Sequence, residues 1–558
     1  MNNLAKSNIL KKYNFYILMA ILAIIISLIA YYKTLIQIEL GPEWDTYDFL
    51  ANALVFAGKG IGYSDPTRPP IISFLTSIFF DFNYVSESVI LIIDGIGFIL
   101  GVIGLYLLFN LRFNPLLSFL GSLLFATFPI VLRWVSVGYS DIFSISILIW
   151  VVYLTIMGIK RDSRYFYLSF PLLMTAFLTR YSSALIIIPI GFYIIVNRKY
   201  INLKNLFIGI LLSFLVLVPV LIFFAIKFGN PLLPFLIFVG GTQQAVSIDN
   251  FAFNPDPLYF INRLPLYISA AGVTAILVSF LGIFLYLISK SKKVTNYIKS
   301  LSLEKIKARK IEIMLFIILF VSFMATFSKI SYIASEIIFF FIVCLLFQLL
   351  KNLNKNIDMD LLFLSWFMVY FIFNSVFMVK VDRYFISMAP ALSYFLMLGL
   401  SWTTAKICIK FKNINLTSVF LVLTLISIIF ISTFSFLSSI PHENSNTNVV
   451  ESSNWLKDYD PNYQHKIIYT DYFWPNYSWY LKMNVKAMPL LTAEKSYDKL
   501  EYYKPNNNEN IAYNKELSKN NVDYYFSIIP NLNLTSYQPI KRFGFITLYK
   551  KTNQDINS

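Results

Sequence analysis

Hydrophobic residues follow one another along most of this chain in runs of about 18–25, separated by short charged loops. A run of that length can cross a hydrocarbon layer of ~30 Å as a helix. The pattern predicts about thirteen membrane-spanning helices. They are expected at residues 13–33, 88–109, 115–132, 139–159, 165–179, 181–197, 205–227, 265–289, 311–328, 331–350, 359–379, 384–404 and 416–438.

Beyond the last run the composition changes, and Asn, Tyr, Lys and Asp become frequent. Alternating apolar and polar residues at 466–470 and 544–549 indicate strands, and the segment 449–457 predicts a helix. About 120 residues suffice for a small domain. We therefore predict an all-α polytopic membrane domain at 1–438, followed by a small α+β domain at 439–558.

Basic residues gather in every second loop, and short loops rich in Lys and Arg face the cytoplasm. The opposite side receives three long segments, at 34–87, 228–264 and 439–558. We expect a multi-pass protein of the plasma membrane, with a cytoplasmic amino terminus and an extracytoplasmic carboxyl-terminal domain. The basic loops include Arg112, Lys160, Arg161, Arg164, Arg198, Lys199 and the segment 290–310.

Composition supports the membrane assignment. Of the 558 residues, 57% are hydrophobic and only 14% are charged, which is too apolar for a soluble globular protein of this size. The formal net charge of +16 is carried mostly by Lys and Arg at the ends of the apolar runs. The charge therefore reports topology and does not predict nucleic-acid binding.

Three acids cluster directly after the first span. Glu43, Asp45 and Asp48 lie within six positions, and Arg68 follows later in the same outer loop, before two prolines. Ionisable groups at a membrane boundary are costly unless they are used. If a helix begins here, Asp45 and Asp48 share a face. A solvated acidic loop would produce the same pattern, so this segment alone does not decide its role.

A further acid, Asp141, stands at the outer end of the fourth span, where the dipole of a helix amino terminus would also favour it. Cations map to the same side of the membrane. Single cations at span ends often only anchor a helix, but together with outward carboxylates they suit an anionic lipid headgroup. They are Arg68, Arg133, Arg180, Lys227, Lys380 and Arg383.

The order and sidedness of these motifs resemble the GT-C glycosyltransferases. The acidic loop, the Arg68-Pro-Pro motif and Asp141 are followed by the segment from Lys380 through Arg383-Tyr384 to Pro390. Within that superfamily the chain looks like the branch of the protein O-mannosyltransferases and the lipid A aminoarabinose transferase. About thirteen spans followed by an outer domain also match that branch.

The resemblance implies a role for each matching residue. Asp45 matches the acidic residue of the first loop, at or near the catalytic base, and Asp141 matches the second acidic position. Arg68 matches the residue that contacts the carrier phosphate. A late Arg-Tyr pair near the headgroup matches Arg383 and Tyr384.

Four more residues complete the predicted site. Arg180 and Lys227 join the expected donor-phosphate residues, and Asp48 is a further acid of the loop. Some relatives have Asp-Glu where this chain has Glu43-Trp-Asp45. Which carboxylate is the base is therefore open, and Glu43 stays among the catalytic candidates.

The residue types fit the implied chemistry. A sugar joined through C1 to a polyprenyl or dolichyl phosphate departs from a lipid phosphate, whose growing charge arginines stabilise. Asp45 can accept the proton of the acceptor hydroxyl, with Asp141 or Glu43 orienting the reactants, and direct attack inverts C1. No cofactor is required, although oxygen ligands would also permit a divalent metal between Asp45 and Asp141.

Other classes of membrane protein remain open. A transporter or flippase of lipid-linked sugars would place charges near the bilayer midplane, often in repeated halves. A polysaccharide polymerase or ligase would rely on a large late outer loop, and a scaffold would not need Asp45. Most charges here lie at the outer boundary, although Asp94 lies inside the second span without an assigned role. The expected partners are the lipid-linked donor, membrane lipid and a protein, lipid or glycan acceptor.

Overall fold

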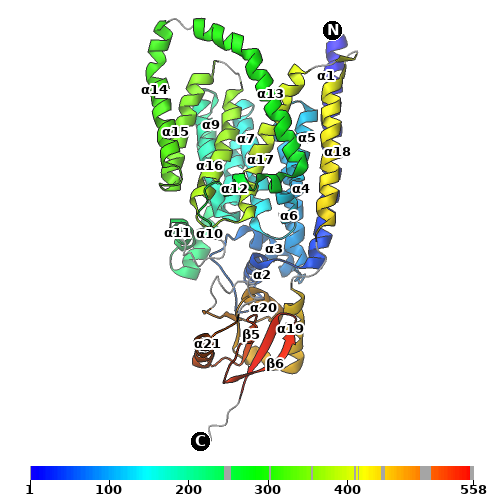
Figure 1. Ribbon diagram of the computed structural model, residues 1–558, viewed down its shortest axis with the longest axis vertical. Helices are drawn as coiled ribbons and strands as arrows, with labels where there is room; N and C mark the ends of the chain where they lie inside the picture. The colour runs from blue at the N-terminus through cyan, green and yellow to red at the C-terminus, as the bar shows by residue number, and fades with distance from the viewer. Residues whose placement is uncertain are drawn as a thin grey trace.

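The computed structural model describes residues 2–243, 253–300, 303–352, 356–407, 410–411, 414–440, 446–490 and 504–552. Its helices form an elongated bundle, and a smaller domain with a β-sheet lies at one end of it (Figure 1). The amino terminus lies at the end of the bundle that is farthest from this domain.

The long helices of the bundle coincide with the predicted runs, and each of the thirteen runs contains a helix. Eight described helices are long and apolar enough to cross a membrane. An integral membrane protein is therefore confirmed, while the number thirteen stays a prediction. The bundle helices are α1 (Asn2–Leu40), α4 (Ser88–Asn110), α5 (Pro115–Ala126), α6 (Pro129–Trp134), α7 (Ser140–Lys160), α8 (Phe166–Thr179), α9 (Ile187–Val196), α10 (Leu203–Phe228), α13 (Leu264–Ser300), α14 (Leu303–Thr326), α15 (Tyr332–Leu350), α16 (Ile357–Val376), α17 (Ala389–Lys406) and α18 (Leu416–Ser438).

Three predicted spans are interrupted. Pro129 begins α6 and lacks the N–H that would continue α5, so the run 115–132 is split in two. The run 181–197 begins as a 3-10 helix, η2 (Tyr181–Ile186), and α17 is preceded by another, η4 (Asp382–Ser387). Shorter 3-10 turns, η1 (Ser163–Tyr165) and η3 (Arg198–Tyr200), connect helices elsewhere.

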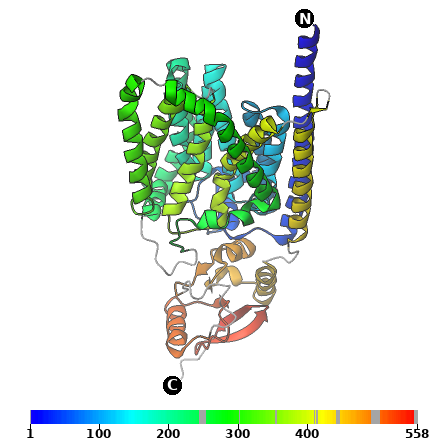
Figure 2. The ribbon, with the colours of Figure 1, turned by 45° about the horizontal axis from the view of Figure 1, so that its top comes forward.

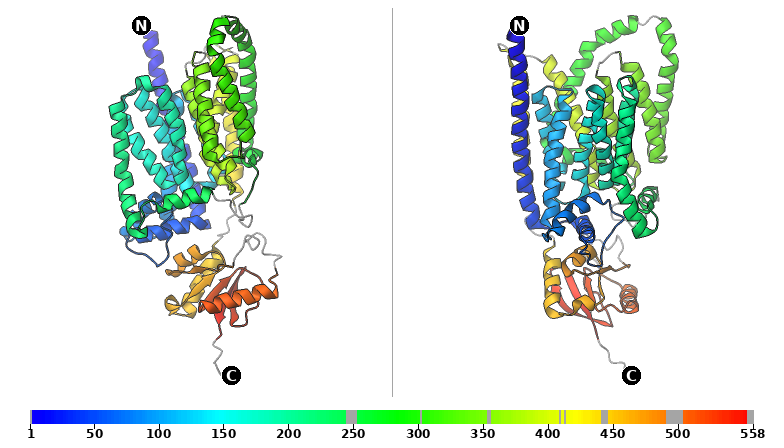
Figure 3. Two further views of the ribbon diagram at one scale, coloured as in Figure 1. Left: turned by 90° about the vertical axis from the view of Figure 1, so that its left-hand side faces the viewer. Right: turned by 180° about the vertical axis from the view of Figure 1, so that it is seen from behind.

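Helix α7 occupies the centre of the bundle. It packs against α4 on one side and α8 on the other, and α10 packs on the far side of α8. Gly101 of α4 faces Ser146 of α7 so closely that a side chain at Gly101 would overlap it, and small residues allow such close packing. A second group, containing α13 to α17, lies beside this first group (Figures 2 and 3).

The outer loops are themselves folded. The first contains α2 (Trp44–Phe56) and α3 (Ile71–Asp81), and the second contains α11 (Leu233–Gln243) and α12 (Tyr259–Asn262). Helix α2 lies between the bundle and the small domain (Figure 1). Its residues from Thr46 to Leu54 are all buried, so the position of Asp45 in the first turn is fixed by packing.

The carboxyl-terminal domain combines helices with a five-stranded mixed sheet, which confirms the predicted small α+β unit. The strand order is β4-β3-β5-β7-β6, with β3 parallel to β4 and β5, and β7 antiparallel to β5 and β6. The described elements are α19 (Thr447–Tyr459), η5 (Tyr463–His465), β3 (Ile468–Thr470), α20 (Trp474–Leu481), β4 (Lys486–Ala487), α21 (Asn507–Lys519), β5 (Tyr524–Ser527), β6 (Tyr537–Phe543) and β7 (Ile546–Lys551). A separate hairpin pairs β1 (Lys410–Phe411) with β2 (Ile414–Asn415).

This domain has its own hydrophobic core and also packs on the first outer loop. The hydroxyls of Tyr47 and Tyr480 are hydrogen-bonded at 2.7 Å. The rings of Trp44 and Tyr472 lie 4.1 Å apart between centroids. Since Trp44 directly precedes Asp45, the domain contacts the helical turn that carries the predicted base.

We predict that a cysteine at His465, which is exposed in the small domain, reacts with a membrane-impermeant maleimide in intact cells. A cysteine at Arg161, which is exposed at the carboxyl-terminal end of α7, should react only after permeabilisation, because basic loops face the cytoplasm. Both variants are made after Cys344 and Cys408 have been replaced by serine. The opposite labelling pattern would reverse the predicted orientation.

Candidate active site

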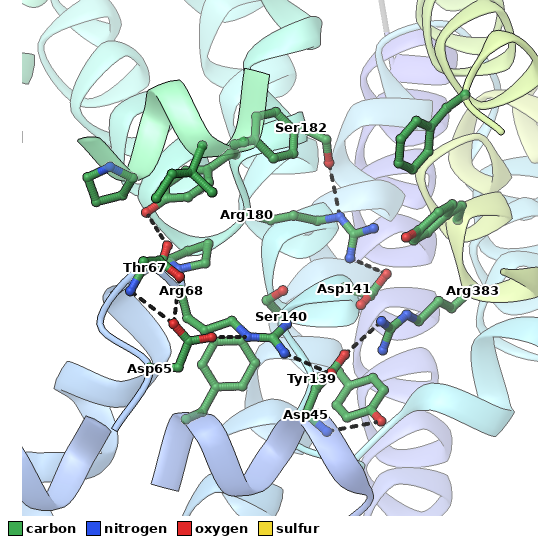
Figure 4. A pocket seen from close by; sticks show the side chains of 18 of the residues that line it. Asp45, Asp65, Thr67, Arg68, Tyr139, Ser140, Asp141, Arg180, Ser182 and Arg383 are labelled. Atoms are coloured by element: carbon green, nitrogen blue, oxygen red, sulfur yellow. Dashed lines mark hydrogen bonds and ion pairs between the residues drawn. The ribbon is translucent and has the colours of Figure 1, made fainter. Parts of the chain in front are cut away.

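Residues from both outer loops, α7 and the late 3-10 turn surround one cavity of about 460 Å³ (Figure 4). The cavity lies at the amino-terminal end of α7, where Ser140 and Asp141 line it. Its charged lining consists of Asp45, Asp65, Arg68, Asp141, Arg180 and Arg383. Its apolar lining includes Phe49, Pro234, Ile237, Phe238, Phe373 and Phe377.

Asp45 lies between two arginines that are far apart in sequence. Arg68 Nη2 donates to Asp45 Oδ1 at 3.0 Å, and Arg383 Nη2 donates to Asp45 Oδ2 at 2.7 Å. The three side chains converge in Figure 4, where they come from α2, the first outer loop and η4. The structure thus brings the predicted base and two predicted phosphate-binding residues into direct contact.

Arg68 is also bound by two further acids. Its Nη2 atom donates to Asp48 Oδ2 at 2.7 Å, and its Nε atom donates to Asp65 Oδ2 at 3.2 Å. Asp65 was not predicted from the sequence, although its place three residues before Arg68 in an Asp-Pro-Thr-Arg turn is a usable signal. Asp48 contacts Arg68 but does not line the cavity.

Asp141 forms the second ion pair of the cavity. It lies in the first turn of α7 and pairs with Arg180 Nη1. Arg180 Nε donates to Ser182 Oγ at 3.0 Å, and the Arg180 guanidinium lies over the ring of Tyr384 at 5.4 Å. Tyr384, which the resemblance placed near the headgroup, thus lines the cavity against Arg180, whereas Arg383 lies over the rings of Tyr139 and Trp134.

Tyr139 connects the two ion-pair systems and was also missed by the sequence analysis. The Arg383 guanidinium lies over its ring at 4.4 Å. Its hydroxyl oxygen accepts the backbone N–H of Asp45 at 3.4 Å. Tyr139 precedes Asp141 by two residues, so one short segment contacts Asp45 and supplies Asp141.

Burial by itself would raise the pKa of the Asp45 carboxyl. The positive charges of Arg383 and Arg68, which are also hydrogen-bonded to it, hold this pKa below its usual value of 3.8. Asp48 behaves differently, because burial outweighs the opposing effect of Arg68 and raises its pKa to about 6. Asp45 is therefore ionised throughout the neutral range, whereas Asp48 titrates just below it.

Each cavity arginine keeps donors for a ligand. A guanidinium carries five N–H groups, and the ion pairs described use two nitrogens of Arg68, two of Arg180 and one of Arg383. In the described part of the chain, at least one nitrogen of each guanidinium is thus available to an incoming anion. Both oxygens of Asp45, by contrast, already accept from arginines.

Two predicted residues lie elsewhere. Lys227 is exposed in the last turn of α10 and does not line the cavity, because α8 separates α10 from α7. Lys227 is therefore not among the residues with which this cavity could bind a phosphate. Glu43 also lies outside the cavity lining; burial raises its pKa, and its nearest charges are Arg133 and Lys33.

The sequence left open a divalent metal between Asp45 and Asp141. Among the described residues, no group of three His, Cys, Asp or Glu side chains that could hold a metal ion is found.

Lys380, one of the outward cations, is buried and donates to the carbonyl oxygens of Asn374, Ser375 and Phe377 at 3.2, 3.0 and 2.6 Å. Lys380 therefore caps the end of α16 and does not reach the cavity.

Comparison with known proteins identifies the fold. Residues 67–223 match the family model described as dolichyl-phosphate-mannose-protein mannosyltransferase. The structure of ArnT from Cupriavidus metallidurans bound to undecaprenyl phosphate is similar, with a TM-score of 0.59 and 12% identity over 96% of this chain and 98% of that one. This chain therefore shares the fold of the ArnT structure. No curated protein sequence matches this chain.

A second similar structure is the oligosaccharyltransferase from Archaeoglobus fulgidus tethered with an acceptor peptide. It has a TM-score of 0.51 and 15% identity over 91% of this chain and 69% of that one. A structure of AglB from the same organism, in complex with an inhibitory peptide and a dolichol-phosphate, has a TM-score of 0.50 and 14% identity over the same shares of the two chains. The predicted resemblance to GT-C glycosyltransferases is thus confirmed, and the matched family segment contains Arg68, Asp141 and Arg180.

We predict that Arg180→Met destabilises the protein by about 3–5 kcal/mol, because Asp141, which is 5% exposed, would keep a buried charge without a partner. The change should appear as a lower midpoint of thermal unfolding in detergent. The double variant Arg180→Met/Asp141→Asn should recover most of the loss. Arg164→Met, which breaks an exposed pair with Asp162, is the control and should leave the midpoint unchanged.

Proposed function

We propose that this protein transfers a sugar from a polyprenyl-phosphate carrier to a hydroxyl of a protein, lipid or glycan acceptor on the outer face of the membrane. The observation that carries the proposal is the convergence of three aspartates and three arginines on one cavity at the outer end of the bundle. A transporter would need its charges nearer the bilayer midplane.

The charged part of the cavity lining fits the phosphate of a lipid-linked donor, and the apolar part fits its prenyl chain. Arg68, Arg180 and Arg383 can bind the phosphate through their remaining N–H groups. Ile237 and Phe238 of α11, together with Phe377, give the same cavity an apolar side suited to the first isoprene units. The ArnT and AglB structures that share the fold hold undecaprenyl phosphate and dolichol-phosphate.

The arrangement supports a direct displacement. The acceptor oxygen forms a bond to C1 of the sugar while the bond from C1 to the phosphate oxygen breaks. Asp45 takes the hydroxyl proton, and the arginines stabilise the second negative charge that develops on the lipid phosphate. Attack opposite the leaving group inverts the anomeric centre. Asp141, held by Arg180, is available to orient a sugar hydroxyl.

We further propose that the reaction proceeds without a metal ion. In many phosphoryl and glycosyl transfers a divalent cation offsets the phosphate charge, but arginines can serve this purpose here. Each oxygen of Asp45 already accepts a hydrogen bond from a guanidinium. A metal between Asp45 and Asp141 would have to displace both Arg383 and Arg180.

Asp45→Asn should reduce sugar transfer by about 10²–10⁴-fold, the contribution typical of a positioned base, while the protein still inserts in the membrane. Transfer of labelled sugar from a polyprenyl-phosphate donor is measured in membranes. Asp81→Asn, an exposed acid of the same outer loop, is the matched control. Full activity of the Asp45 variant would remove this residue from its role.

Arg68→Ala should raise the KM for the donor by roughly 10–100-fold, which corresponds to about 1.5–3 kcal/mol for a hydrogen bond to a charged group. The KM for the acceptor should change by less than about twofold, because the lost contact is to the phosphate. Lys227→Ala, outside the cavity, is the control and should leave both values unchanged. Equal effects on donor and acceptor would place the phosphate elsewhere.

The pH profile tests Asp45 as the base. A base acts when ionised, so with Asp45 as base kcat/KM should stay level as the pH falls from 7 to about 4, because the pKa of Asp45 is lowered. Arg383→Gln removes a lowering charge and should shift the acid limb to higher pH. A limb near pH 6 in the wild type would contradict Asp45 as the base.

A further inference from the structure

Asp94 is a carboxylic acid inside a membrane-spanning helix, and the proposed reaction does not use it. It lies in α4, is 0% exposed and does not line the cavity. An ionisable side chain in a span is costly and is retained where it has a partner and a role. The surroundings of Asp94 show both.

The partner is the turn that joins α6 to α7. Ser136 and Gly138 have φ values of +59° and +86°, so the backbone curls around a common centre. The N–H groups of Ser136, Val137 and Gly138 face the Asp94 carboxyl, with Gly138 N at 3.5 Å from Oδ2. Successive N–H groups in such a turn form a concavity that favours an anionic oxygen. Asp94 fills this concavity from α4.

Two threonines tie the same turn to other helices. Thr34 Oγ1 of α1 lies 2.7 Å from Ser136 Oγ, and Thr46 Oγ1 of α2 donates to the Val137 carbonyl at 2.8 Å. Position 138 has no room for a side chain, because a Cβ there would lie 2.7 Å from Thr46 Cγ2. The turn is therefore a buried junction of α1, α2, α4 and α7.

Asp45 and Asp141, the two carboxylates of the proposed reaction, lie close in sequence to residues of this junction. Thr46 directly follows Asp45 in α2, and the turn continues through Tyr139 into Asp141. A shift of the 136–138 turn would move Asp45 and Asp141 relative to each other. Misplacement of reacting groups by about 1 Å can cost roughly 100-fold in rate.

We infer that Asp94 is a positioning residue that holds the 136–138 turn and, through it, sets the distance between Asp45 and Asp141. The expected effect of Asp94 on the rate rests on the proposed sugar transfer. The expected effect on the structure rests only on the contacts of the 136–138 turn. Asp94 touches neither donor nor acceptor.

Two variants test the inference. Asp94→Ala removes the acceptor oxygens of the turn, and Thr46→Val removes only the hydroxyl that ties α2 to it and is the milder change. Both should lower kcat by roughly 10–100-fold with donor KM within about twofold, because the arginines that bind the phosphate keep their partners. Asp94→Asn retains one acceptor oxygen and should recover most of the activity lost in Asp94→Ala.

The double variant Asp94→Ala/Thr46→Val examines whether both residues act through one turn. Residues that share a partner give non-additive effects, so the double variant should lose less than the product of the two single losses. The controls are Asp360→Asn, a buried acid paired with Arg112 at the other end of the bundle, and Thr155→Val, a buried hydroxyl bonded to Ser169 at 2.7 Å. Neither control should change kcat.

Hydrogen exchange gives a readout that does not depend on activity. Peptides containing 135–141 should exchange faster in Asp94→Ala than in the wild type, and at the wild-type rate in Asp360→Asn. Unchanged exchange in Asp94→Ala, or unchanged kcat in both Asp94→Ala and Thr46→Val, would overturn the inference. A wild-type protein that transfers no sugar would instead overturn the proposed function, and exchange alone would then decide the role of Asp94.

Discussion

The ion pairs of Asp45 with Arg68 and Arg383 are the contacts on which the outer end of this molecule depends. The pair with Arg383 joins residues that are 338 positions apart in the chain, and the pair with Arg68 spans 23 positions. Charges removed from water are tolerated only when each has a well-placed partner. The first outer loop, α7 and η4 must therefore keep a fixed mutual arrangement.

The remainder of the fold supports this arrangement from two sides. From the bundle, breaks in helical geometry before η2 and η4 present Arg180 and Arg383 to the cavity. From outside, the small domain packs on α2 through aromatic rings that include Trp44, the neighbour of Asp45. Residues of the bundle and of the loops thus line the charged cavity, and the small domain supports it indirectly by packing on α2.

Much of the site could be predicted because sidedness and residue type restrict the choices. Asp45, Arg68, Asp141, Arg180 and Arg383 were all predicted and all line the cavity. Lys227 shares their type and side, but the helix that carries it lies beyond α8. Asp65 and Tyr139 were missed because their roles come from what they contact: Asp65 holds Arg68, and Tyr139 lies beneath Arg383.

The sequence by itself determined which segments are apolar enough to cross a membrane, how the basic residues alternate between the loops, and that a small α+β unit follows the apolar part. These follow from the solvent preference of each segment, which is a local property. Only the tertiary structure decided which charges pair, why Asp94 is tolerated in α4 and which cations reach the cavity. Those outcomes depend on helix order, on the interruption of helices and on close backbone approach, none of which is encoded in a single run of residues.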